Sequence, residues 1–124
     1  MVKVLVVEDN ELNMKLFQDL LSLMDCEIIA TRTGTNAFEL CKTYLPDLIL
    51  MDIQLDGISG IDIIKQVKSD SELSDIPVIA ISAYAMKHEE AKILQSGCDK
   101  YISKPMSIEH FFSAVKHYIE KANA

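Results

Sequence analysis

Short apolar runs alternate with stripes of apolar residues at helical spacing along the whole chain, and this alternation restricts the possible folds more than any other feature. Four runs are nearly continuous in apolar residues, which is typical of strands covered on both faces. These runs are Val2 to Val7, Ile28 to Ala30, Leu48 to Met51 and Val78 to Ile81. A shorter and more polar run, Lys100 to Ser103, suits an edge strand.

The segments between these runs predict helices with one apolar face each. The first is expected from about Glu11 to Met24, and Ser107 is expected to cap a long last helix. The apolar stripes of the four clear helices are Leu16, Phe17, Leu20, Leu21 and Met24; Phe38, Leu40 and Cys41; Ile61, Ile63, Ile64 and Val67; and Ile108, Phe111, Phe112, Val115 and Ile119. Residues His88 to Ser96 carry few apolar side chains, so this helix should be weakly held. Such alternation predicts a parallel sheet with helices on both faces.

The length and charge of the chain narrow its functional classes. A chain of 124 residues has the size of one domain, and we expect a single domain over residues 1–124 without an effector domain. The 12 basic and 19 acidic residues give a net charge of −7. Because a protein that binds nucleic-acid backbones needs a basic face, this charge disfavours nucleic acid and favours proteins or cations as partners.

Two further patterns bear on the cellular compartment. The longest strongly apolar uncharged stretch, Ile76 to Met86, is shorter than the ~18 residues that span a membrane. The three cysteines are odd in number and have no Cys-x-x-Cys spacing, so neither a disulfide framework nor a zinc site is indicated. We therefore expect a protein of the reducing cytoplasm that does not insert into membranes.

Polar side chains follow the predicted strands where the strands end. Ligands of open parallel sheets bind outside the carboxyl ends of the strands, so we expect these side chains to converge. They are Glu8 and Asp9 after the first strand, Asp52 after the third, Ser82 after the fourth, and Lys104, which precedes Pro105, after the fifth. Helix capping could explain any one of them, but it does not explain Asp52, because no helix is expected before about Ser59.

Three carboxylates in one crevice require a positive partner, since each pair repels by about 4 kcal/mol at 4 Å and an effective dielectric constant near 20. Oxygen ligands without histidine or cysteine favour a hard cation, and a few carboxylates with room for water suit Mg²⁺. Lys104 adds an ammonium group for an anion that arrives on Asp52. Together these groups indicate a phosphoryl-transfer site.

These motifs resemble those of two-component response-regulator receiver domains over the whole chain. The matching segments are Val6-Val7-Glu8-Asp9-Asn10, Pro46 to Asp52, Ile81-Ser82-Ala83 and Ser103-Lys104-Pro105. The spacings also agree, with 43 residues from Asp9 to Asp52, 30 from Asp52 to Ser82 and 22 from Ser82 to Lys104. Glu8 to Leu16, Met51 to Leu55 and Ala83 to Lys87 are similar to segments of DivK-like single-domain regulators of cell-cycle phosphorelays.

The resemblance implies a flavodoxin-like fold, a (βα)5 doubly wound parallel sheet with strand order 2-1-3-4-5. It also implies that Asp52 accepts the phosphoryl group. Asp9 and Asp52 would bind Mg²⁺ directly, Glu8 would bind it through water, and Gln54 would bind it through its main-chain carbonyl.

The remaining matches imply residues that bind the phosphoryl group and change conformation in response to it. Ser82 and Lys104 would bind phosphoryl oxygens, Tyr101 would be the switch aromatic, and the Lys104-Pro105 peptide would be cis. The family usually has a proline four residues after the phosphoacceptor, where this chain has Asp56. An Asp-Gly turn needs no proline, so this departure bears on docking rather than on the fold.

The function that the resemblance implies is a single-domain response regulator that catalyses only its own phosphorylation and dephosphorylation. It would take the phosphoryl group from a histidine kinase or phosphotransfer protein and signal by binding a downstream signalling protein. We expect donors to dock on the first helix near Asn13 and Met14 and on the loop at Pro105 and Met106. Readers are expected to bind the face made by the fourth helix, the fifth strand, which carries Tyr101, and the fifth helix.

Two other interpretations stay open from the residues alone. An aspartate-nucleophile phosphatase also places an aspartate at a strand end, but it needs a second carboxylate two residues later, where this chain has Gln54. A receiver-like module could bind proteins without phosphorylation, although such a module need not keep all five polar residues.

Overall fold

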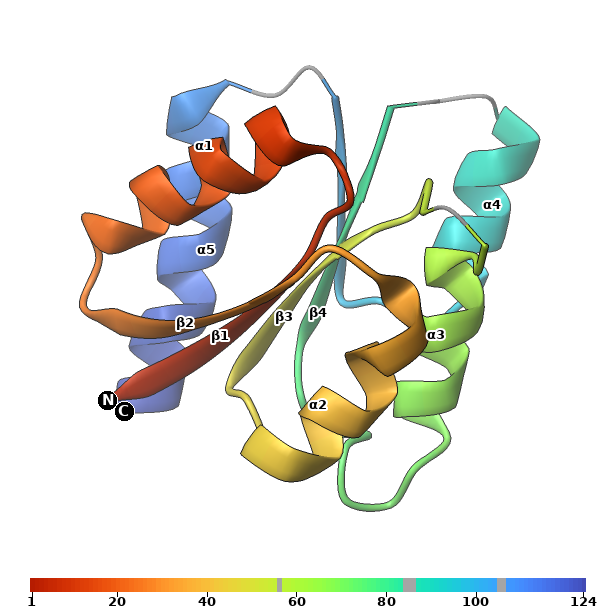
Figure 1. Ribbon diagram of the computed structural model, residues 1–124, viewed down its shortest axis with the longest axis horizontal. Helices are drawn as coiled ribbons and strands as arrows, with labels where there is room; N and C mark the ends of the chain where they lie inside the picture. The colour runs from red at the N-terminus through yellow and green to blue at the C-terminus, as the bar shows by residue number, and fades with distance from the viewer. Residues whose placement is uncertain (56, 84–86, 105–106) are drawn as a thin grey trace.

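The computed structural model describes residues 1–55, 57–83, 87–104 and 107–124, which form a parallel sheet between two layers of helices (Figure 1). The strands are β1 (Val2–Val7), β2 (Cys26–Thr31), β3 (Leu48–Asp52), β4 (Val78–Ser82) and β5 (Lys100–Ser103). The helices are α1 (Glu11–Ser22), α2 (Ala37–Tyr44), α3 (Gly60–Lys68), α4 (Lys87–Gln95) and α5 (Ile108–Asn123), with a short 3-10 helix at Gly34–Asn36. The predictions for Asp56, Pro105 and Met106 fall outside the described residues.

The strand order is β2-β1-β3-β4-β5, which confirms the predicted flavodoxin-like arrangement. Every residue of β3 and β4 is buried, as their continuous apolar runs predict. Parallel pairing places Val7 beside Met51 and Asp52 beside Ile81. Because all the strands run in the same direction, their carboxyl ends lie at one edge of the sheet.

The second strand differs from the prediction. The run at Ile28 to Ala30 was expected to be covered on both faces, but Ile28 and Ile29 are half-buried and Ala30 is exposed. The reason is that β2 is an edge strand, with β1 as its one neighbour in the sheet. The prediction of an edge position for β5 is confirmed.

Two apolar layers hold the helices to the sheet. On one face α1 and α5 lie side by side (Figure 1), where Phe17 and Phe111 stack with their ring centroids 5.5 Å apart. On the other face lie α2, α3 and α4. In α4, Ile93 is buried while Leu94 is 55% exposed, so this helix has little apolar anchorage, as predicted. None of the helices in the described ranges is long and apolar enough to cross a lipid bilayer.

Helix α3 begins against the end of β3. The Ser59 hydroxyl caps α3 by accepting from the Ile61 N–H at 3.2 Å, and the Gly60 N–H donates to the Ile53 carbonyl at 3.1 Å. A Cβ atom on Gly60 would overlap the Asp52 carbonyl oxygen and lie 2.8 Å from the Ile53 Cα atom. Glycine at this position therefore allows the close approach that holds the main chain of Asp52.

We expect Gly60→Ala to lower the free energy of unfolding by about 2 kcal/mol, because the clash is with main-chain atoms that cannot rotate away. Chemical denaturation with an unchanged m-value would measure the loss. Gln66→Ala, at an exposed position of α3, serves as the control and should change stability by less than about 0.5 kcal/mol. Equal stability of the Gly60→Ala variant and the wild type would contradict the proposed packing role.

Candidate functional site

Three carboxyl groups meet at the carboxyl ends of the adjacent strands β1 and β3. Glu8 and Asp9 follow β1, and Asp52 ends β3, which pairs with β1. One ligand oxygen from each of the three residues lies within 4.8 Å of the other two. Glu8 has no exposed surface, Asp52 is 3% exposed and Asp9 is half-buried. The structure thus brings together the three carboxylates that the sequence placed at strand ends.

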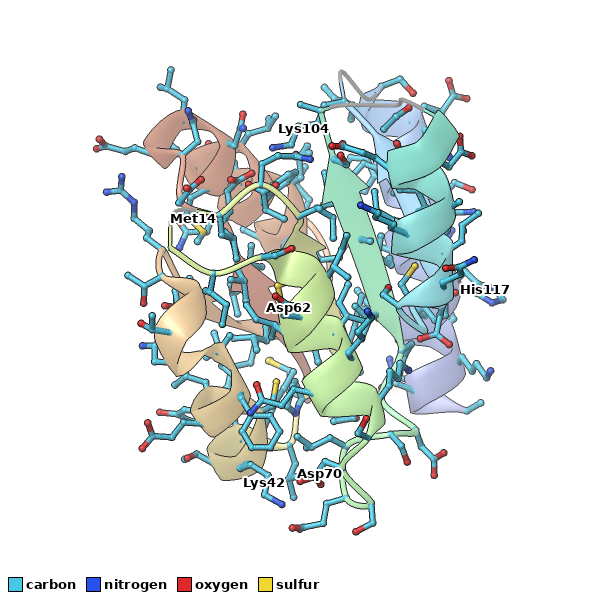
Figure 2. The ribbon with its side chains drawn as sticks, turned by 90° about the vertical axis from the view of Figure 1, so that its right-hand side faces the viewer. Met14, Lys42, Asp62, Asp70, Lys104 and His117 are labelled. Atoms are coloured by element: carbon cyan, nitrogen blue, oxygen red, sulfur yellow. The ribbon has the colours of Figure 1, made fainter. Side chains whose placement is uncertain are left out.

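Lys104, which follows the edge strand β5, provides the compensating positive charge. Its Nζ atom lies 3.0 Å from Glu8 Oε1 and 3.7 Å from Asp52 Oδ2, and its side chain is 19% exposed. The Lys104 N–H donates to the Ser82 carbonyl at 2.7 Å, which ties the end of β5 to the end of β4. Figure 2 shows Lys104 at one end of the molecule and the Lys42–Asp70 ion pair at the opposite end.

The environment of the site shifts the pKa values of the two buried carboxyl groups in opposite directions. Burial, a hydrogen bond with Glu8 and the Glu8 charge raise the pKa of Asp52 to about 7, against the opposing effects of Lys104 and the Gln54 N–H. Burial also acts to raise the pKa of Glu8, but the hydrogen bond from Asp52 and the Lys104 ammonium outweigh it, so the pKa of Glu8 lies below its usual value. Glu8 is therefore the ionised partner of Lys104, while Asp52 titrates near neutral pH.

The group of carboxylates fits a hard divalent cation. When all three carboxyl groups are ionised, they and the one ammonium group carry a net charge of −2, which one divalent cation would cancel. The donors are all oxygen atoms, and Asp9 is accessible enough for water to complete the coordination. Glu8, Asp9 and Asp52 are the residues that would hold Mg²⁺.

Gln54 joins this site to β4, and its side chain is the contribution that the sequence did not predict. Its N–H donates to Asp52 Oδ1, two residues earlier in the chain, at 3.1 Å. Its side-chain Nε2 donates to the Ser82 hydroxyl at 2.7 Å, and its Oε1 accepts from the Ala83 N–H at 3.0 Å. No local pattern could have signalled these contacts, because the partners lie 28 and 29 residues away along the chain.

Tyr101, the predicted switch aromatic, is half-buried on β5 opposite Ala80 of β4. Its hydroxyl oxygen is buried and has no hydrogen-bond partner of normal geometry among the described residues. Burial and the charges of Glu90 and Glu89 raise the pKa of Tyr101, and nearby Ser82 lowers it by a smaller amount. The phenol thus lies close to the Ser82 end of the site.

The predicted docking residues of the first helix, Asn13 and Met14, have little exposed surface. Met14 is 5% exposed because its side chain packs in the layer between α1 and the sheet. Asn13 is half-buried, and its N–H donates to the capping Asn10 side chain at 3.0 Å. The exposed apolar side chains of this helix are Leu12, at 78%, and Leu16, at 44%. The apolar surface that α1 exposes is therefore made by Leu12 and Leu16 rather than by Met14.

Comparison with known proteins places this arrangement in a family. Residues 4–116 match the response regulator receiver domain. The chain therefore belongs to the receiver-domain family of two-component signalling.

Within this family the chain is similar to DivK. It is 52% identical over 119 residues to the polar-differentiation response regulator DivK of Brucella ovis, and the match covers 96% of this chain and 97% of that protein. DivK of Brucella abortus (strain 2308) matches with the same identity and coverage. The chain is thus a DivK-like receiver domain, as the motifs around Asp9, Asp52 and Ser82 predicted.

Solved structures agree on the fold. The receiver domain of the Francisella response regulator 1452 superposes with a TM-score of 0.87 at 25% identity and covers 98% of each chain. The receiver domain of the sensor histidine kinase PA1611 from Pseudomonas aeruginosa superposes with a TM-score of 0.88 at 24% identity, over 96% of this chain and 98% of that one. That structure contains a magnesium ion in its active-site cleft.

We expect the cation-free protein to lose stability as the pH rises from about 4 to 7. The pKa of Asp52 in the folded state, about 7, lies above its unfolded value near 4, so the folded state binds more protons in this range. Asp52→Asn should therefore be more stable than the wild type in chelator at pH 8, by on the order of 2 kcal/mol, and the difference should shrink towards pH 5.

Thermal and chemical unfolding in chelator at several pH values would measure this difference. Asp25→Asn, which removes an exposed carboxyl, is the matched control and should show little change at any of these pH values. A wild type that becomes more stable than Asp52→Asn on going from pH 5 to pH 8 would contradict the assigned pKa direction.

Proposed function

We propose that this chain is a phosphorylation-dependent switch in which Asp52 accepts a phosphoryl group in the presence of Mg²⁺. The observation that carries the proposal is the meeting of Glu8, Asp9 and Asp52 with the Lys104 ammonium group in one largely buried site. A buried excess of negative charge has no structural benefit by itself, because it raises the free energy of the folded state. A cation and an arriving phosphoryl group give this charge a function.

The chain's own groups divide the chemical work. The Gln54 N–H holds Asp52 Oδ1, and the other oxygen, Oδ2, lies 3.7 Å from Lys104 Nζ. An Asp52 oxygen attacks the phosphorus atom of a phosphohistidine. A new P–O bond forms, the P–N bond breaks, and the imidazole nitrogen leaves with the electron pair and takes up a proton. Lys104 and the Ser82 hydroxyl bind oxygens of the transferred group.

The proposed cofactor is Mg²⁺, held by Glu8, Asp9 and Asp52, with the Gln54 main-chain carbonyl as a further ligand. When bound, it neutralises the carboxylates and the negative charge of the transferring group. The charge balance of the site supports this, and the magnesium ion in the PA1611 receiver domain offers a parallel in the same fold.

The proposed partners are proteins. The phosphoryl donor is a histidine kinase or phosphotransfer protein. A downstream signalling protein binds the face formed by α4, β5 with Tyr101, and α5 when Asp52 is phosphorylated. The net charge of −7 disfavours a nucleic-acid partner, and we propose a cytoplasmic location without membrane insertion. The chain would catalyse only its own phosphorylation and dephosphorylation. An aspartate-nucleophile phosphatase is disfavoured, because the position of its second carboxylate is held here by Gln54, whose amide is bonded to Ser82 and Ala83.

Incubation with acetyl phosphate and Mg²⁺ should add one phosphoryl group to the chain, measured as intact mass and lost on treatment with hydroxylamine. Asp52→Asn and addition of chelator should each abolish the added mass, because one removes the acceptor and the other the cation. Lys104→Ala should keep cation binding and slow phosphorylation by at least about tenfold, since it removes the charge that pairs with the transferred group. Labelling that survives Asp52→Asn would refute the proposal.

We expect phosphoryl donors to dock on the exposed apolar face of α1. Replacing Leu12 and Leu16 together by alanine should slow transfer from a phosphorylated histidine kinase of the DivK type by about tenfold, as expected when interface anchors are truncated. Labelling by acetyl phosphate, which needs no docking surface, should not change. Leu23→Ala is the matched control, because Leu23 is 76% exposed at the other end of α1.

Substitution of Tyr101 by alanine should have the reverse effect. It should weaken phosphorylation-dependent binding of the output protein more than it slows transfer to Asp52. Loss of both activities from either surface would contradict the separation of donor and reader sites.

A further inference from the structure

The Gln54 side chain connects the end of β3 with the end of β4. Gln54 is half-buried two residues after Asp52, and its side-chain amide makes hydrogen bonds to Ser82 at the end of β4 and to Ala83, the residue that follows it. Its Nε2 atom lies 2.7 Å from the Ser82 hydroxyl, and its Oε1 atom lies 3.0 Å from the Ala83 nitrogen. One side chain thus forms hydrogen bonds with both the Ser82 hydroxyl and the Ala83 N–H.

The chemistry of the partners fixes the orientation of this amide. The Ala83 N–H can only donate, so the amide oxygen has to face it. The amide nitrogen then faces Ser82, and because an NH₂ group only donates, the Ser82 hydroxyl has to accept. A flipped amide would set two donors against each other at Ala83, so the bridge has one stable orientation.

The same two groups are the ones that an anion on Asp52 would meet. Asp52 pairs with Ile81 in the sheet, so Ser82 and Ala83 are the next residues along the neighbouring strand. Gln54 contacts Asp52 with its main-chain N–H and Ser82 with its side chain, and therefore lies between the two. A hydroxyl and an N–H in this place are suitable donors for phosphoryl oxygens.

We propose that the Gln54 amide is a clamp that competes with the phosphoryl group for Ser82 and Ala83, and that phosphorylation opens it. This inference rests on the proposed function, because it takes Asp52 as the phosphoryl acceptor. Bonds from Ser82 and Ala83 to an anionic phosphoryl oxygen are charge-assisted and stronger than bonds to a neutral amide. The clamp is therefore stable without the phosphoryl group and is displaced with it.

The structure provides a place for the released side chain. A cavity of about 240 Å³ adjoins Gln54 on the side of α3 and α4. It is lined by Ile53, Gln54, Ser59, Ile61, Glu89, Lys92 and Ile93. The Ser59 hydroxyl, the Glu89 carboxyl and the Lys92 ammonium offer polar partners for an amide that turns into it. Gln54 can thus exchange one set of polar contacts for another, as a two-state element requires.

The position of this cavity links the clamp to the weakly held helix. Glu89, Lys92 and Ile93 belong to α4, so an amide that leaves β4 would arrive against α4. Release of the clamp would therefore free Ala83 and change the packing against α4 in one movement. We assign to Gln54 a positioning role, since it acts through Ser82 and Ala83.

Two variants and a control test the clamp in the unphosphorylated protein. Gln54→Met keeps the length of the side chain and removes both hydrogen bonds, and Gln54→Ala removes the side chain without adding bulk. Amide hydrogen exchange, measured by NMR, should be several-fold faster at Ala83 in both variants than in the wild type. Gln66→Met, at an exposed position of α3, should leave the exchange at Ala83 unchanged.

The competition is tested with beryllofluoride and Mg²⁺, a phosphoryl mimic that forms on a carboxylate without covalent transfer. Both Gln54 variants should bind beryllofluoride roughly three- to tenfold more tightly than the wild type, the factor expected when one net hydrogen bond no longer has to be broken. In the wild type, exchange at Ala83 should remain slow after binding, because a new acceptor replaces the amide.

The outcomes separate this inference from the proposed function. Unchanged exchange at Ala83 in both variants would refute the clamp. Faster exchange with equal or weaker beryllofluoride binding would refute the competition. If neither the wild type nor any variant binds beryllofluoride in the presence of Mg²⁺, the proposed function fails, while faster exchange at Ala83 would still establish the clamp itself.

Discussion

The buried carboxylate of Glu8 and the ammonium group of Lys104 are 96 residues apart in the chain and 3.0 Å apart in the fold. A carboxylate without exposed surface is strongly unfavourable unless a cation or several donors lie beside it. Lys104 provides the cation, and the Asn10 N–H donates a second bond at 3.3 Å. The pair also leaves Asp52 as the carboxyl that titrates near neutral pH. The charge distribution of the whole site therefore depends on this one ion pair.

The site keeps more negative charge than stability alone would allow. When both are ionised, the carboxylates of Glu8 and Asp52 repel each other at the ends of β1 and β3, and one lysine cannot neutralise both. Proteins commonly hold such unfavourable arrangements where function requires them. Here every residue of β3 and every residue of β1 except Lys3 is buried, so the sheet can hold the carboxylates in place against their repulsion.

The mechanical contrast between the two sides of the site suits a switch. The carboxylates are attached to β1 and β3, which are firmly held because nearly all of their residues are buried. Beyond Ser82 the chain leads to α4, which has little apolar anchorage, with Leu94 more than half exposed. Gln54 spans this boundary, since its main chain contacts Asp52 and its side chain contacts Ser82 and Ala83. A change of charge at Asp52 can therefore reach the weakly held element through one residue.

The sequence by itself determined the alternation of strands and helices and the positions of Glu8, Asp9, Asp52, Ser82 and Lys104 at strand ends. It could do so because hydrophobic periodicity is local and because parallel strands bring their carboxyl ends to one edge. The tertiary structure decided which side chains face outward, so that Met14 is buried while Leu12 and Leu16 are exposed, and Ile28 is only half covered. It alone decided the partners of the Gln54 amide and the raised pKa of Asp52. Both depend on distances between groups far apart in the chain, and burial strengthens those interactions only once the sheet has formed.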